Sequence, residues 1–206
     1  MSLNTGQEKY SYAIGMNVGG SLREQELDLA LPAFLQGFQD VYSGGATEMS
    51  EEDMHEALGI LQQTMRSRQA EKAQAASAKN IEAGKAFLEA NKAAEGVQVT
   101  ASGLQYKVLQ AGTGATPKLS DTVTTHYAGT LLSGKEFDSS YRRGEPASFP
   151  VQGVIAGWTE ALQLMTVGSK WRLYIPSELA YGERGAGQDI EPHSTLVFDI
   201  ELLAIK

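Results

Sequence analysis

Residues 151–165 read VQGVIAGWTEALQLM, and the rest of the chain is organised around this stretch. It begins as the apolar end of a strand, turns at Gly157 and continues as a short helix. The helical part carries four apolar side chains at the spacing i, i+3, i+4 and i+7: Trp158, Ala161, Leu162 and Met165. Because these side chains share one face, a short helix lying across a curved antiparallel sheet would bury them. The concave side of such a sheet, with the indole as its floor, would form an apolar pocket.

The composition excludes several classes of protein and of site. The chain has 206 residues, of which 42% are hydrophobic and 20% charged, as in an ordinary globular protein. It has no cysteine, which excludes disulfides, thiolate nucleophiles and cysteine metal sites. The net charge of −8 lies mostly in the first half and argues against binding to nucleic acid. The nearly neutral second half suits an uncharged ligand.

Neither a membrane span nor a leader is visible in the sequence. No apolar run approaches the roughly 20 residues that a transmembrane helix needs. The first residues, MSLNTGQEKY, lack a basic region followed by an apolar core. We therefore expect a cytoplasmic protein. A periplasmic or cell-surface location is the alternative if residues 1–3 replace a natural leader.

The first half of the chain predicts helices. Ile14, Val18 and Leu22 are four residues apart and form an apolar stripe, with Gly15 and Gly19 beside it. A loop around Gly19 and Gly20 is the alternative there. A second helix begins near Pro32 and ends at the glycines after Ser43. Its apolar face is supplied by Phe34, Leu35, Phe38, Val41 and Tyr42.

A long third helix is predicted from the capping pattern of Ser50 and Asp53 to a terminating Gly96, with no proline in residues 51–94. Residues 66–80 contain alanine but no large apolar side chain, so we expect them to cross solvent as a spacer; a flexible linker is the alternative. Short helices give a thin core for so many residues, so we expect a homodimer through the N-terminal helices. The predicted organisation is a helical dimerisation domain over 1–70, the continuation of the connecting helix over 71–96 and a second domain over 97–206.

From Gly96 onward the pattern predicts short strands separated by turns. The last of these strands alternates clearly, with Leu196, Phe198, Ile200 and Leu202 on one face. The segment 177–193 is rich in glycine and polar residues and long for a passive connection, so it is a candidate rim for a binding site.

Five motifs in this region, taken in order, resemble those of FKBP-type peptidyl-prolyl isomerases. They are YAG at 127–129, GKEFDSS at 134–140, GVIAGW at 153–158, AYG at 180–182 and PHSTLVF at 192–198. The helical first half is similar to the bacterial Mip and 22-kDa FKBP subgroup, whose members are homodimers. The resemblance implies an α+β fold, with a curved antiparallel sheet wrapped on one short helix and preceded by an all-α dimerisation module.

The resemblance also implies the site residues. The catalytic set is Asp138, Tyr181, Phe137 and Trp158, and the substrate-binding set is Tyr127, Arg143, Phe149, Val154, Ile155, Ile190 and Phe198. In the family, the N–H matching Ile155 and the hydroxyl matching Tyr181 bond ligand carbonyls. The sequence departs from common family patterns at Ala147, Ala186 and Glu191, which bears on macrolide affinity and on the residue preferred before proline. Without the resemblance, Trp158 would be a core residue and Asp138 a turn residue.

The implied activity is isomerisation of X–Pro bonds in peptides and folding proteins, and it needs no cofactor and no metal. Rotation about an amide has a barrier of about 18–20 kcal/mol. The twisted transition state is less polar than the planar amide, so an apolar pocket would favour it. The expected partners are proline-containing polypeptides, and the resemblance also implies macrolides of the FK506 and rapamycin type as ligands. The alternative is a binding-only chaperone or scaffold that uses the same pocket.

Overall fold

The structure is a computed structural model that describes residues 3–206. Contacts within the chain divide it into two compact units, one ending at Gln63 and one comprising Thr64–Lys206. The two units are described separately.

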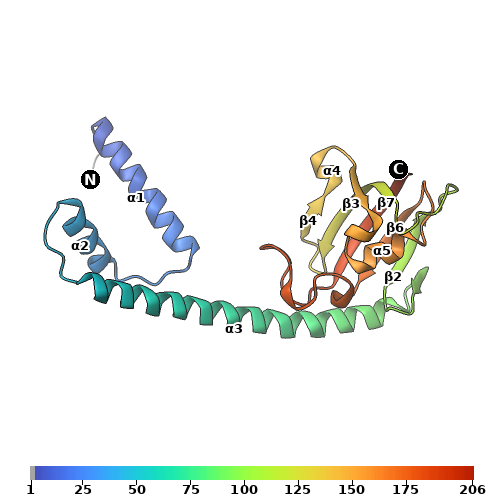
Figure 1. Ribbon diagram of the computed structural model, residues 1–206, viewed down its shortest axis with the longest axis horizontal. Coiled ribbons are helices and arrows are strands. Elements are labelled where there is room, and N and C mark those ends of the chain that lie inside the picture. The colour runs from blue at the N-terminus through green and yellow to red at the C-terminus, as the bar shows by residue number, and fades with distance from the viewer. Residues whose placement is uncertain (1–2) are drawn as a thin grey trace. The chain divides into compact units, whose positions relative to one another are not determined.

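Three helices precede the sheet: α1 (Gly6–Glu24), α2 (Leu31–Tyr42) and α3 (Glu51–Asn91), labelled in Figure 1. Thr5 caps α1 in a reciprocal capping box with Glu8. Both Gly19 and Gly20 lie inside α1, so the helix prediction is confirmed there and the loop alternative is wrong. The third helix is continuous over 41 residues, which confirms a helix rather than a flexible linker.

The apolar faces of α1 and α2 are not covered within the described residues, since neither helix has a buried side chain. Phe38 of α2, for example, remains 60% exposed and stacks on Tyr42 of the same helix, with ring centroids 5.6 Å apart. Over residues 3–206, none of the helices combines the length and the hydropathy that crossing a membrane requires.

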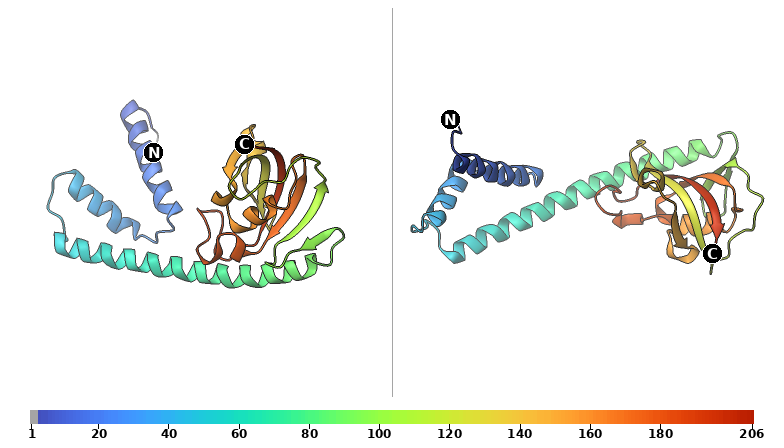
Figure 2. Two further views of the ribbon diagram at one scale, coloured as in Figure 1. Left: turned by 45° about the vertical axis from the view of Figure 1, so that its right-hand side comes forward. Right: turned by 90° about the horizontal axis from the view of Figure 1, so that it is seen from above.

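Within the part of the chain that the structure describes, seven strands form one open antiparallel sheet in the order β1-β2-β6-β7-β3-β4, with β5 paired to β3 (Figure 2). Their bounds are β1 (Val97–Val99), β2 (Gln105–Gln110), β3 (Thr122–Leu131), β4 (Glu136–Ser139), β5 (Ala147–Pro150), β6 (Lys170–Ile175) and β7 (Leu196–Ile205). Two short helices interrupt the strands, α4 (Ser140–Arg143) and α5 (Ala156–Leu162), and the single turns η1 (Val151–Gly153), η2 (Ser177–Leu179) and η3 (Gly182–Arg184) lie in the connections.

The core lies between α5 and the sheet, as the opening stretch of sequence predicts. The helix ends at Leu162, three residues before Met165, and all four side chains of the predicted apolar face are nevertheless buried. The alternate residues of β7 that were expected to face inward are buried too: Leu196, Phe198, Ile200 and Leu202. On β3 the same alternation buries Tyr127 and leaves His126 on the opposite face. The fold is therefore α+β, as predicted.

The prediction that residues 66–80 cross solvent as a spacer fails at their C-terminal end. From Ala73 onward, one face of α3 is partly covered, and its residues recur at helical spacing: Ala73, Ala76, Ser77, Asn80, Gly84, Phe87, Leu88 and Asn91. At Gly84 the helix approaches Thr195 so closely that an added Cβ would lie 2.3 Å from the Thr195 hydroxyl oxygen. The sequence does not predict this covered face because its first members are small or polar side chains, which form no apolar stripe.

Candidate functional site

A cavity of about 450 Å³ opens between α5 and the concave face of the sheet. It is lined by Tyr127, Phe137, Asp138, Phe149, Gly153, Val154, Ile155, Trp158, Tyr181 and Phe198. Nine of the eleven residues predicted as site residues are in this lining. The sheet, α5 and the loop after β6 bring them together from positions more than 70 residues apart in the chain.

Aromatic rings form the floor and walls. Trp158, only 4% exposed, is surrounded by Tyr127, Phe149 and Phe198 at centroid distances of 5.2, 5.8 and 5.3 Å, with interplanar angles of 84–86°. Such edge-to-face contacts fix each ring in position. Phe137 extends the wall through a similar contact with Phe198 at 5.5 Å. A volume of this size and lining suits a small apolar ring such as that of proline.

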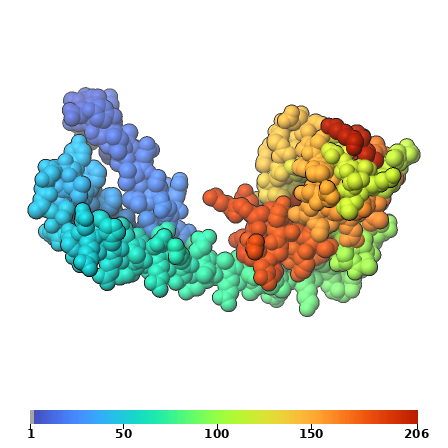
Figure 3. Space-filling model, viewed as in Figure 1, coloured from blue at the N-terminus to red at the C-terminus, as the bar shows by residue number. Residues whose placement is uncertain are grey.

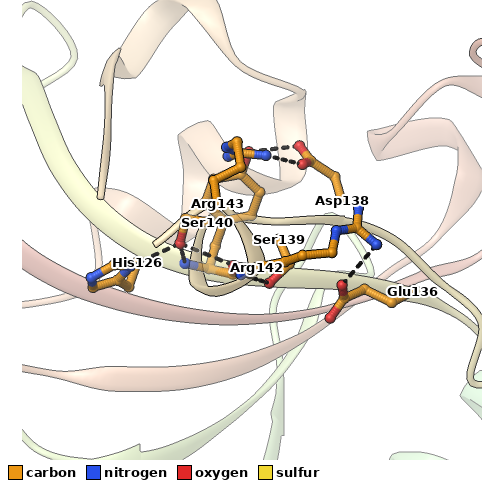
Figure 4. Close-up of polar contacts among 8 residues, drawn as sticks. His126, Glu136, Asp138, Ser139, Ser140, Arg142 and Arg143 are labelled. Carbon is orange, nitrogen blue, oxygen red and sulfur yellow. Dashed lines mark hydrogen bonds and ion pairs between the residues drawn. The ribbon is translucent and has the colours of Figure 1, made fainter. Parts of the chain in front are cut away.

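A hydrogen-bonded group of three side chains forms one edge of the cavity. The Tyr127 hydroxyl donates to Asp138 Oδ2 at 2.6 Å and accepts from Arg143 Nη2 at 2.7 Å. The other guanidinium nitrogen of Arg143 pairs with Asp138 Oδ1 (Figure 4). The neighbouring Arg142 pairs instead with Glu136 at 3.2 Å, so of these two adjacent arginines only Arg143 joins the group at the cavity edge.

The hydrogen bonds among Tyr127, Asp138 and Arg143 influence which of the side chains at the cavity edge are ionised. Burial is the largest influence on Asp138 and opposes its ionisation, but hydrogen bonds from Tyr127 and Arg143 and the arginine charge together outweigh it and lower the pKa of Asp138. Burial raises the pKa of Tyr127, and the hydrogen bond to Asp138 adds to the rise. Burial, followed by the charge of Asp138, likewise raises the pKa of Tyr181. At neutral pH the edge therefore holds one carboxylate and two neutral phenols.

Among residues 3–206 the buried indole N–H of Trp158 has no hydrogen-bond partner, and two further polar groups at the cavity also have none. One is the hydroxyl of Tyr181, a side chain that is 40% exposed, and the other is the backbone N–H of Ile155, which precedes the first turn of α5. Both can donate to a carbonyl of a bound ligand.

The two remaining predicted residues lie outside the lining. Arg143 acts on it through Tyr127 and Asp138, as described above. Ile190 is 8% exposed and packs into the core, while its backbone pairs with Ala186 to shape the loop.

Sequence reasoning missed two residues that position the site. The buried Ser140 hydroxyl accepts from the Tyr127 N–H at 2.7 Å and donates to the Tyr127 carbonyl at 3.2 Å, which holds that stretch of β3 (Figure 4). At Gly129 an added Cβ would lie 2.5 Å from Phe198 and 2.7 Å from Phe137, so only glycine lets both rings occupy the wall. Both residues lie within the quoted motifs, and only the folded contacts reveal what they do.

Within the described residues, no group of three or more histidine, aspartate or glutamate side chains could hold a metal ion. His126 stacks on Tyr141 with centroids 4.7 Å apart and bonds Ser140, away from the cavity. What the cavity offers is an apolar enclosure with a few polar groups at its edge.

Comparison with known proteins matches nearly the whole chain. The profile of FKBP-type peptidyl-prolyl cis-trans isomerases matches residues 114–203, and that of the domain amino-terminal to this isomerase matches residues 7–108. The chain is 47% identical to the FKBP-type 22 kDa peptidyl-prolyl cis-trans isomerase of Escherichia coli, over 99% of this chain and 98% of that protein. It is 44% identical to the outer membrane protein MIP of Legionella longbeachae, over 100% and 88%. The crystal structure of FkpA from Escherichia coli superimposes with a TM-score of 0.77 at 40% identity, covering 100% of this chain and 99% of that one.

These relatives correct the prediction of a cytoplasmic location. One relative that matches over the full chain is by name an outer membrane protein, so the cytoplasmic assignment is wrong. That prediction rested on the pattern of the first residues in the given sequence, which does not decide the compartment, and the rest of the cysteine-free chain suits either compartment.

The order of the motifs, the aromatic cavity and the full-length matches agree, and the chain belongs to the FKBP-type peptidyl-prolyl cis-trans isomerases, in their Mip-like branch.

Proposed function

We propose that the aromatic cavity is the isomerase site of this chain and that it binds the prolyl residue of a polypeptide over Trp158. The observation that supports this most is the set of perpendicular rings around a cavity of about 450 Å³. In such a site Phe137, Phe149 and Phe198 enclose the ring, and Val154 completes the apolar lining.

The catalytic effect would come from the change in polarity along the reaction. The planar X–Pro amide has charge separation between its oxygen and nitrogen, and the twisted amide loses it. A water-poor apolar enclosure therefore destabilises the planar form relative to the twisted one, which is differential binding of the transition state. The Ile155 N–H and the Tyr181 hydroxyl would hold flanking carbonyls and align the peptide.

The Tyr181 hydroxyl provides the test of this assignment. Tyr181→Phe keeps the ring and removes one hydrogen bond to the substrate, so kcat/KM for a proline tetrapeptide in a protease-coupled assay should fall by about two- to tenfold. Tyr141→Phe is the matched control, because its hydroxyl bonds Glu201 and its ring does not line the cavity. Equal activity of Tyr181→Phe and the wild type would mean that this wall of the cavity is wrongly assigned.

We further propose that the N-terminal helices form a homodimer that holds unfolded substrates. The support is the uncovered apolar surface of α1 and α2, which includes Ile14, Met16, Val18, Leu35, Phe38 and Val41. A second copy of the same module would bury this surface.

The dimer is tested by Phe38→Glu in the full-length chain. A charge in the centre of the α2 face should convert a dimer into a monomer, measured by light scattering at micromolar concentration. Activity on a short proline peptide should persist, whereas acceleration of a proline-limited protein refolding reaction should fall severalfold. A wild-type chain that scatters as a monomer would contradict the proposal at once. A monomeric variant that still accelerates refolding fully would leave the helical module without a holding role.

The proposal extends to macrolide binding and to the compartment of the protein. A macrolide of the FK506 or rapamycin type would place one apolar ring in this cavity and would then compete with the peptide substrate. The name of the Legionella relative favours a compartment outside the cytoplasm.

A further inference from the structure

The loop that carries Tyr181 lies between two cavities. The aromatic cavity is on one side, and on the other a hollow of about 230 Å³ separates the base of the loop from the C-terminal part of α3. Asn80, Gly84 and Leu88 line this hollow from the helix, and Ser177, Glu178 and His193 line it from the loop. Figure 3 shows the orange-red segment of the loop against the green part of α3. Because of this hollow, α3 covers the base of the loop only in part, and polar contacts from α3 add to the packing of Ile190 in the core.

Asn80 supplies these contacts. Its side-chain amide donates to the Pro192 carbonyl at 3.0 Å and lies 3.3 Å from Glu191 Oε2 and 3.5 Å from Ser194 Oγ. The segment that it holds is the C-terminal end of the loop, 111 to 114 residues further along the chain.

The contact continues from Pro192 to Tyr181 within the loop. The His193 N–H donates to the Gly182 carbonyl at 2.8 Å, directly after Tyr181. Further along, Ala186 and Ile190 pair through two backbone hydrogen bonds of 2.8 and 3.1 Å. The loop is thus a closed unit whose base is formed by Gly182 and His193, and Asn80 bonds the residue next to that base.

The rest of the covered face of α3 keeps Asn80 in place. Gly84 allows close approach to Thr195, and Phe87 contacts Tyr174 with ring centroids 5.7 Å apart. One turn further, the Gln105 side chain donates to the Leu88 carbonyl at 2.8 Å and accepts from Asn91 at 2.8 Å. This part of α3 is therefore anchored to the sheet on the C-terminal side of Asn80.

We propose that Asn80 is a positioning residue for the isomerase site: from α3 it fixes the loop Gly182–His193, and through the loop the hydroxyl of Tyr181 at the edge of the cavity. The inference rests on the proposed role of Tyr181. It makes the long helix a part of the catalytic unit, in addition to its role as a connection to the N-terminal helices.

The test compares Asn80→Ala and Asn80→Asp in the full-length chain. Loss of one neutral hydrogen bond should lower kcat/KM for a proline tetrapeptide by about two- to tenfold. Asn80→Asp keeps the shape but replaces the donor with a carboxylate that faces the Pro192 carbonyl and Glu191, so it should lose at least as much. If Asn80 acted through packing alone, Asn80→Asp would keep the activity of the wild type, because it keeps the shape of the side chain. Gln74→Ala is the matched control, since it removes an exposed amide from the same helix.

Two further measurements connect the effect to the loop. Hydrogen exchange at the amides of Ala186, Ile190 and His193 should accelerate in Asn80→Ala and stay unchanged in Gln74→Ala. In a Tyr181→Phe background, Asn80→Ala should cause little additional loss, because both changes remove the same contact to substrate.

The proposal is overturned if Asn80→Asp has wild-type activity, if the losses of Asn80→Ala and Tyr181→Phe multiply, or if exchange in the loop is unchanged. Failure of the proposed function has a different signature. If the proposed function is wrong, the single variant Tyr181→Phe would retain wild-type activity. Hydrogen exchange at the loop amides would still show whether Asn80 holds the loop.

Discussion

Replacing Trp158 with alanine should reduce kcat/KM for a proline tetrapeptide by about 10- to 1,000-fold, the largest loss expected of any single change in this chain. The indole contacts three aromatic rings edge to face, and each such contact is worth about 0.5–1.5 kcal/mol. Without the indole the cavity has no floor, and water can enter beneath the prolyl ring. Water would then solvate the planar amide, and the site would no longer destabilise the planar amide relative to the twisted transition state.

A fall in activity alone would not prove this, because removal of a buried tryptophan also costs about 3–5 kcal/mol of stability. The chain contains its own control in its only other tryptophan. Trp171 is 7% exposed and stacks on Tyr106 with centroids 4.3 Å apart, outside the cavity lining. Trp171→Ala should therefore lower the midpoint of thermal unfolding about as much as Trp158→Ala does. It should leave kcat/KM of the folded protein within about twofold of the wild-type value.

Trp158→Phe tests whether the reaction needs the indole itself or only an apolar aromatic side chain as the floor of the cavity. It keeps an aromatic surface beneath the prolyl ring and should retain activity to within about tenfold of the wild type. If folded Trp158→Ala were as active as Trp171→Ala, the idea of a dry aromatic enclosure would have to be given up.

The same tryptophan illustrates how much the sequence predicts. The spacing of Trp158, Ala161, Leu162 and Met165 predicts a buried face that α5 and the turn after it form, and alternation along residues 196–202 predicts the inner face of β7. Both patterns are strong because burial of large apolar side chains dominates the free energy of folding. Nine predicted residues consequently meet at one cavity, although the motifs that contain them are dispersed over some 70 residues.

What the sequence could not predict depends on contacts between small or polar groups. Gly129, Ser140 and Asn80 carry no apolar signal, and their effects arise from partners that only folding brings close. The covered face of α3 begins with alanine, serine, asparagine and glycine, and a segment without large apolar side chains is predicted to be exposed to solvent. The compartment was wrongly predicted for a separate reason, since the residues that fold a domain do not encode its location.

The second large effect is expected at Asp138. Asp138→Ala should lower kcat/KM by about ten- to a hundredfold, because hydrogen bonds to a charged group contribute about 1.5–3 kcal/mol. The change removes the acceptor for the Tyr127 hydroxyl and leaves Arg143 without its carboxylate at the cavity edge. Tyr127 would then be free to turn from its position against Trp158.

The control for this variant is another aspartate–arginine pair on the same sheet. Asp199 on β7 accepts two hydrogen bonds from Arg172 on β6, at 2.6 and 2.7 Å, and neither residue lines the cavity. Asp199→Ala should therefore lower stability without a comparable loss of kcat/KM.

The pH dependence gives an independent check on Asp138. Since its pKa in the folded protein is lowered, its ionised form stabilises the fold above the pKa of the unfolded chain, and this stabilisation is lost as the pH falls through the folded pKa. The raised pKa values of Tyr127 and Tyr181 keep both phenols neutral below about pH 10. The kcat/KM of the wild type should accordingly be flat from about pH 5 to 9, and the stability difference between wild type and Asp138→Ala should shrink below about pH 4. A step in activity near neutral pH would mean that a group other than Asp138, Tyr127 or Tyr181 controls the site, and the assignment of this edge would then be incorrect.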